Sequence, residues 1–355
     1  MQLERLAAHT GGPTICLVAP GEDRTGSDDE LAINVSNLLA EAGRLLDEAD
    51  LEREELQVLQ DLLIQASSVA GELPTRHGVW MAISEDLGVV AVPLSPGVGA
   101  APEVSFTDRL GLLRPLLEHE QRPRELLVLT LSDAAADLAV LDIGARELVS
   151  VGAPFPLPFE GDGTGVQARS TGSRQRDARR RNHWRRVAAA AHEVIVARDL
   201  PLVTVGVDRN HGFLAEVSAW PEELAVPVVA SPDALDAQEL IDRVLAAATE
   251  HGERRVEDAR MLVESRRGGG RVATGVTDLY AAAVAGRIEL LLLVDGPMTP
   301  GFLTPDGHLV LQDAGGGTPV ADVHSLGITE VIRRGGRAVL APDGTLDAAM
   351  ATLRW

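Results

Sequence analysis

The chain has 355 residues and a formal net charge of −21, which predicts two or three domains and excludes a general affinity for nucleic acid. All 32 basic residues are Arg, so any RNA contact would use guanidinium groups gathered in one place. The single Cys16 cannot form an internal disulfide, and the charged first residues are not typical of a signal peptide. Apolar runs such as 288–294 are too short to span a bilayer. We therefore expect a cytoplasmic protein without a membrane partner.

The sequence pattern over residues 1–122 predicts an N-terminal α/β domain. An apolar run bounded by prolines at 13–20 is typical of a buried strand. Residues 28–70 carry leucines near helical spacing with acidic residues on the other face, which indicates helix. Residues 78–94 alternate and turn near 86–88, which predicts a β-hairpin.

Residues 123–231 predict a middle domain in which strands precede a helix and a further strand. That order favours an RNase H-like fold, with the last strand parallel to an earlier one. The predicted elements are strands at 126–131, 136–143 and 147–151, a Gly/Pro-rich loop at 152–172, a helix at 179–198 and a strand at 202–207.

Residues 232–355 predict a C-terminal domain of alternating helices and short strands. Such alternation is typical of an α/β sandwich. The predicted elements are helices at 232–265, 276–285 and 323–334 and strands at 288–294 and 338–340.

Basic charge is concentrated around the start of the middle-domain helix, where eight arginines accompany one acid, Asp177. Guanidinium groups bind phosphate and an aromatic ring can stack on a base, so this composition predicts an RNA contact. The alternatives are a solvated helix face, or arginines paired with acids elsewhere in the chain. The candidate RNA-binding residues are Arg169, Arg174, Arg176, Arg179, Arg180, Arg181, Trp184, Arg185 and Arg186.

The Gly-rich loop at 161–172 precedes this helix. Its spacing matches neither a Walker loop nor a dinucleotide fingerprint, so we expect no cofactor, and a flexible loop is the simpler interpretation. The nine His show no zinc-ligand spacing, and we expect no metal. The carboxylates near predicted strand ends are interpreted as turn residues; they are Asp133, Asp137, Asp142 and Asp208.

Three stretches together resemble a known family. They are residues 13–46 (PTICLVAP to GRLL), 109–138 (RLGLLRPLL to AAADL) and 327–355 (GITEVIRRGGRAVLAP and the final AAMATLRW). In order and spacing they resemble the bacterial archaeo-eukaryotic release factor family, and its third subfamily most closely. The resemblance covers essentially the whole chain. It implies an RNase H-like middle domain and an L7Ae-like C-terminal domain. It also implies the ribosome as a partner, through ribosomal RNA at the A site, with a translational GTPase as a further candidate.

The same resemblance gives the loop a role. The family's Gly-Gly-Gln loop precedes a basic helix, and here residues 165–167 (Gly-Val-Gln) precede 185–188 (Arg-Arg-Val-Ala), which makes Gln167 the candidate catalytic residue. Val166 replaces the second glycine, and a β-branched residue resists the positive φ that glycine permits. The candidate loop residues are therefore Gly163, Gly165 and Val166.

We accordingly expect a factor that occupies the ribosomal A site in hibernation, rescue or stress without catalysing a reaction. One alternative is a peptidyl-tRNA hydrolase that uses Gln167. Another is a protein-interaction module that never meets the ribosome.

Overall fold

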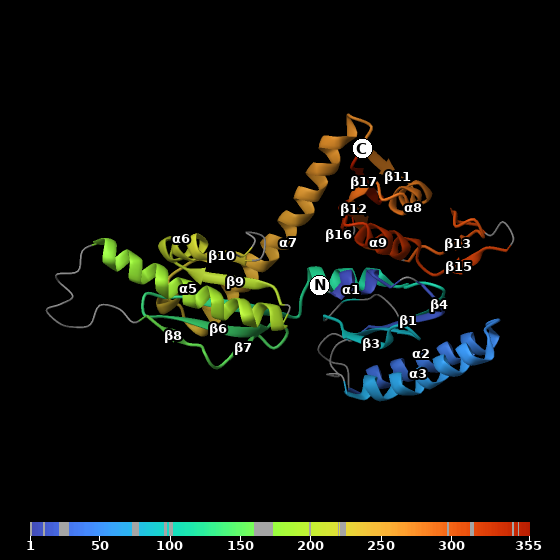
Figure 1. Ribbon diagram of the computed structural model, residues 1–355, viewed down its shortest axis with the longest axis horizontal. Coiled ribbons are helices and arrows are strands. Elements are labelled where there is room, and N and C mark those ends of the chain that lie inside the picture. The colour runs from blue at the N-terminus through green and yellow to red at the C-terminus, as the bar shows by residue number, and fades with distance from the viewer. Residues whose placement is uncertain are drawn as a thin grey trace. The chain divides into compact units, whose positions relative to one another are not determined.

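The computed structural model describes residues 2–9, 11–20, 28–72, 78–95, 98, 102–159, 173–198, 200–218, 220, 225–296, 298–312, 316–342, 344–346 and 348–355. Over these residues the chain is a mixed α/β protein with several separate sheets (Figure 1). It forms two compact units: a middle unit, residues 123–254, and a terminal unit that combines residues 1–122 with 255–355. The division into three domains at 122/123 and 231/232 stays a prediction.

The middle unit contains one mixed sheet in the order β10-β9-β5-β6-β7, with β8 paired to β6. β9 and β10 run parallel to β5, which confirms the predicted parallel strand, and β6 and β7 run antiparallel. The strands are β5 (Glu125–Leu131), β6 (Ala135–Asp142), β7 (Glu147–Ser150), β8 (Leu157–Pro158), β9 (Leu202–Gly206) and β10 (Ala225–Val229).

Helices cover both faces of this sheet. One face packs on α5 and α6 through a core that includes Leu129 and Trp184. The other packs on the first half of α7 through Val128 and Val244. These residues are buried because central strands of such a sheet are apolar on both faces. The helices are α5 (Ser173–Arg198), α6 (Asp208–Val217), the short 3-10 turn η3 (Pro232–Ala234) and α7 (Ala237–Arg267).

The terminal unit begins with an antiparallel sheet in the order β3-β2-β1-β4. The single helical stretch predicted over 28–70 is two helices, α2 and α3, which pack on one face of this sheet through Leu46 and Leu59. The elements are α1 (Gln2–Ala7), β1 (Thr14–Ala19), α2 (Asp28–Glu48), α3 (Arg53–Glu72), β2 (Val79–Ser84), β3 (Gly88–Pro93), β4 (Glu103–Thr107) and α4 (Leu113–Gln121).

The second part of the terminal unit has a four-stranded sheet in the order β11-β17-β12-β16 and a small three-stranded sheet. The second half of α7 covers the larger sheet through Val263. The elements are β11 (Val272–Thr274), α8 (Val276–Val284), β12 (Ile288–Val294), β13 (Gly301–Leu303), β14 (Leu309–Val310), β15 (Thr318–Val320), α9 (Val323–Arg333), β16 (Arg337–Ala341) and β17 (Met350–Leu353).

The first and last parts of the chain share one hydrophobic core in the terminal unit. Trp80 and Leu116 from the first part are buried with Leu291 and Ile328 from the last part. Burying a large apolar side chain contributes about 1.5–3 kcal/mol, so a common core holds the two parts together more strongly than scattered surface pairs would.

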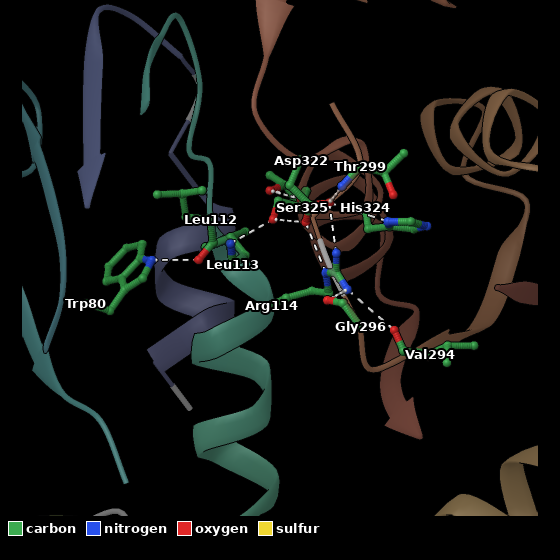
Figure 2. Close-up of polar contacts among 11 residues, drawn as sticks. Trp80, Leu112, Leu113, Arg114, Val294, Gly296, Thr299, Asp322, His324 and Ser325 are labelled. Atoms are coloured by element: carbon green, nitrogen blue, oxygen red, sulfur yellow. Dashed lines mark hydrogen bonds and ion pairs between the residues drawn. The ribbon is translucent and has the colours of Figure 1, made fainter. Parts of the chain in front are cut away.

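A buried polar joint lies beside this core (Figure 2). Arg114 of α4 donates to both carboxylate oxygens of Asp322, at 3.2 and 3.3 Å, and to the Gly296 carbonyl at 2.8 Å. Ser325 donates to Asp322 at 2.9 Å and accepts from the Leu113 amide at 2.8 Å. Because a buried charge is costly unless it is paired and hydrogen-bonded, these contacts specify how α4 meets α9.

In the described parts of the chain, no helix is both long and apolar enough to cross a membrane.

Candidate nucleic-acid interface

Helix α5 positions the arginines that the sequence singles out. Its inward face carries Trp184, Val187 and Ala191, each at most 3% exposed and spaced three or four residues apart. That spacing is one stripe of an α-helix, and it packs on the sheet of the middle unit. The remaining faces of the helix carry mostly polar residues.

Four exposed arginines of α5 lie between residues 179 and 186. Arg179 and Arg186 lie seven residues apart, which places them two turns apart on one stripe, while Arg181 and Arg185 lie four apart on another. Arg180 is half-buried, because it falls in line with the inward stripe. These two stripes, with Arg179, Arg181, Arg185 and Arg186, form the exposed arginine surface of α5.

The contacts of Arg181 with Glu216 and of Arg185 with Asn182 are exposed and weak. Arg181 donates to Glu216 of α6 at 2.8 Å, with about half of each side chain exposed, and Arg185 donates to Asn182 at 3.2 Å. An exposed ion pair contributes about 0–1 kcal/mol and is screened by salt. Phosphate can therefore replace Glu216 as the partner of Arg181 at little cost.

Trp184 is a core residue, so the stacking role predicted for it is wrong. Its side chain is 3% exposed and packs among Leu129, Val187 and Ala191. The ring also meets the edge of His183 at 4.9 Å between centroids. An indole enclosed in this way cannot stack on a base without leaving the core.

The remaining candidates fall outside the described residues. The loop residues Gly163, Gly165 and Val166, the candidate catalytic Gln167, and Arg169 are among them, and so are the side chains of Arg174 and Arg176. Their predicted roles stay predictions.

The strand-end carboxylates make local structural contacts. Asp142 accepts from the Ala145 amide at 2.9 Å and from Arg124 at 3.2 Å. Burial alone would raise the pKa of Asp142, but these hydrogen bonds and the Arg124 charge lower it. Asp137 accepts from the Leu138 amide at 2.9 Å. Within the described residues no group of three or more potential metal ligands is found.

Sequence reasoning missed Glu216 as a neighbour of the arginines. Glu216 lies 35 residues after Arg181, and the two meet only because α5 and α6 pack on the same face of the sheet. No local pattern encodes that contact, since it depends on how β9 returns beside β5.

Residues 125–287, a little under half of the chain, match the model of bacterial archaeo-eukaryotic release factor family 3. The match spans the sheet of the middle unit and the whole of α5. It confirms the family, and the third subfamily, predicted from the sequence. A comparison with curated proteins gives no match.

Solved structures of low similarity include translation factors. The archaeal translation termination factor aRF1 is 13% identical, with a TM-score of 0.26, covering 100% of this chain and 95% of that one. Ribosome-bound archaeal Pelota with ABCE1 is 12% identical, with a TM-score of 0.43 and coverage of 100% and 93%. Dom34 of S. cerevisiae is 10% identical, with a TM-score of 0.46 and coverage of 78% and 80%. TM-scores this low carry no argument about activity or partners, and the family match covers residues 125–287 alone.

Proposed function

We propose that this chain, a member through residues 125–287 of bacterial archaeo-eukaryotic release factor family 3, is a ribosome-binding translation factor homologue that catalyses no reaction. It would occupy the A site during hibernation, rescue or stress, with α5 against ribosomal RNA. The observation that carries the proposal is the exposed arginine surface of α5 in a chain of net charge −21.

The charge contrast favours an approach to RNA by this helix. Exposed guanidinium groups can each release counterions from a phosphate backbone, which is the main source of affinity for nucleic acid. The many acidic residues elsewhere in the chain oppose contact away from basic surfaces and so limit non-specific binding. Because Arg179, Arg185 and Arg186 are exposed, they can reach phosphates without rearrangement of the core.

The proposal extends to partners and location. A factor of this kind would work in the cytoplasm, where ribosomes are. The family resemblance makes a translational GTPase a second candidate partner.

Co-sedimentation with 70S ribosomes at about 50 mM and about 200 mM salt tests the arginine surface. We expect wild-type protein to sediment at low salt and to be largely released at high salt. The Arg179/Arg185/Arg186→Gln variant should bind more weakly at low salt. Raising the salt concentration lowers the affinity of both proteins. Because the variant makes three fewer phosphate contacts, the factor by which its affinity falls should be about twentyfold smaller than the factor for the wild type.

A matched control separates this surface from net charge. Arg243, Arg254 and Arg260 are exposed on α7, and their replacement by Gln changes the charge by the same amount. We expect that control to sediment like the wild type. Equal binding by wild type and the α5 variant would reject the proposed surface.

Ribosomes loaded with labelled peptidyl-tRNA test the non-catalytic part of the proposal. We expect no release of the peptide above the rate without protein. Release that disappears in the Gln167→Ala variant would instead make the chain a peptidyl-tRNA hydrolase.

A further inference from the structure

A second basic surface lies in the terminal unit, at one end of the sheet β11-β17-β12-β16. Arg271 precedes β11, Arg287 precedes β12, Arg337 begins β16 and Arg354 follows β17. With Trp355 they form what we call the arginine edge. Figure 1 shows the C-terminus beside β11 and the last turn of α7.

Backbone hydrogen bonds fix the arginine edge as one structure. The Leu353 amide donates to the Arg271 carbonyl at 2.9 Å, and the Arg354 amide donates to the Arg287 carbonyl at 2.8 Å. The Arg287 guanidinium also donates to the Trp355 carbonyl at 3.4 Å. Residues from four strand ends are thus held together by the sheet, although they come from separate places in the sequence.

In the part of the chain that the structure describes, the four arginines of this edge lack the side-chain carboxylate partners that neighbouring arginines have. Among the described residues, none of Arg271, Arg287, Arg337 or Arg354 forms an ion pair with an Asp or Glu side chain, and Arg287 contacts only the main-chain oxygen of Trp355. By contrast, nearby arginines at helix ends are paired, as Arg266 is with Glu289 at 3.5 Å. Three of the four are exposed, and Arg354 is half-buried.

Helix dipoles explain only part of this charge. α7, α8 and α9 all end near this edge, and arginines in a last turn stabilise the negative end of a helix. Arg333 of α9 fits that explanation. Arg271, Arg287 and Arg337 do not, because they stand at the starts of strands, beyond the helix ends.

The indole of Trp355 points to the kind of ligand. The residue as a whole is 68% exposed, whereas Trp80 and Trp184 are 0% and 3% exposed. A large exposed ring is unusual in a chain with only 3% aromatic residues. Guanidinium groups that no Asp or Glu side chain neutralises, placed beside an exposed aromatic residue, are typical of proteins that bind single-stranded RNA. The charges bind phosphates and a base stacks on the ring.

We propose that the arginine edge binds single-stranded or looped RNA, with phosphates on Arg271, Arg287 and Arg337 and one unpaired base stacked on Trp355. The site is separate from α5 and does not rest on the function proposed above. It would give the protein a second RNA contact, carried by the terminal unit.

Fluorescence anisotropy with a short end-labelled oligouridylate tests this site in the full chain, using the Arg179/Arg185/Arg186→Gln background to remove the α5 contribution. We expect Trp355→Ala to weaken binding about tenfold and Trp355→Phe to retain most of it, because a phenyl ring still stacks. Arg271/Arg287/Arg337→Gln should lower the salt slope, in log–log form, by about 2. RNA should also quench tryptophan fluorescence in the parent protein but not in Trp355→Ala.

The control is again Arg243/Arg254/Arg260→Gln, which should bind RNA like its parent. Thermal unfolding of each variant, followed by circular dichroism, shows whether it is folded. If a triple variant fails to fold, the exposed single changes Arg271→Gln and Trp355→Ala carry the test. Unchanged RNA affinity in folded variants would overturn the proposal. So would tight binding of an acidic peptide with the same dependence on Trp355, which would make the edge a protein-docking surface.

Discussion

At the scale of single residues, the surroundings of a side chain decide its chemistry. Cys16 lies in β1, fully buried, and its sulfur accepts a hydrogen bond from the Gly111 amide at 3.3 Å. Burial raises the pKa of the Cys16 thiol to about 12, outweighing the hydrogen bond, which lowers it. The thiolate is the reactive form, so this thiol is chemically inert while the protein is folded.

We therefore predict that a thiol reagent at pH 8 leaves Cys16 unmodified in the native protein and modifies it after denaturation in urea. Mass spectrometry of the intact chain measures the extent of reaction. Rapid modification of folded protein would show that the core around β1 opens readily.

Asp322 couples the polar joint to pH. Burial would raise the pKa of its carboxyl, but the nearby His324 and Arg114 side chains lower it below its usual range. A carboxyl with a lowered folded-state pKa contributes stability above its unfolded pKa of about 3.9, and that contribution is lost as the pH falls. The joint should therefore weaken in acid.

Asp322→Asn tests this coupling. The change removes the negative charge that neutralises the buried Arg114, so we expect the free energy of unfolding at pH 7 to fall by about 3–5 kcal/mol. The variant should also lose less stability than the wild type between about pH 5 and pH 3. Urea unfolding at each pH gives both quantities, and parallel pH curves for the two proteins would contradict the assignment.

At the scale of elements, the sequence predicts those with a strong local pattern. The apolar runs of β1, β5, β9 and β12 and the periodic leucines of α2 and α3 are found as predicted. α4 was missed because it is short and carries Pro115 in its first turn. β17 was missed because four residues form a strand only when β11 and β12 pair with them.

The face of α5 was harder to predict than the helix itself. Arginines flank Trp184 on both sides, so composition alone suggested that the ring shares their exposed surface. In the structure Trp184 instead lies on the buried face of the helix, in line with Val187 and Ala191. The exposed side of the helix thus carries the arginines but not the ring, and the RNA-binding role of the arginines stays a prediction.

Trp184→Ala distinguishes these two roles. Deleting a buried indole should destabilise the middle unit by about 3–5 kcal/mol, because it leaves a cavity against Leu129. Where the variant is still folded, its ribosome affinity should stay within about twofold of the wild type. Thermal unfolding and co-sedimentation measure the two effects, and weak binding by a variant of normal stability would restore the stacking role.

At the scale of the whole molecule, the sequence does not reveal that the first and last parts share a core. The hydrogen bond from Leu113 to Ser325 joins residues 212 positions apart. Nothing in the local pattern of either segment specifies such a partner, because apolar faces match many others in shape and chemistry. A boundary at residue 122 therefore looks like the end of an independent domain when only the sequence is read.

We predict that a fragment of residues 1–122 does not fold alone, because Trp80 and Leu116 would lose the apolar partners that cover them. A fragment of residues 255–355, added or co-expressed, should restore a cooperative unfolding transition. Circular dichroism during heating follows that transition. Cooperative unfolding of 1–122 by itself would show that the shared core is dispensable.

The central claim is that the exposed face of α5 lies against ribosomal RNA, and hydroxyl-radical cleavage from a tethered iron chelate measures this most directly. The chelate is attached at Asn182→Cys, an exposed position among the arginines, and in a control at Gln238→Cys on α7; the buried Cys16 needs no replacement. We predict strong cleavage of ribosomal RNA around the A site from position 182 and little from position 238. Bound protein that gives no cleavage from position 182 would contradict the account.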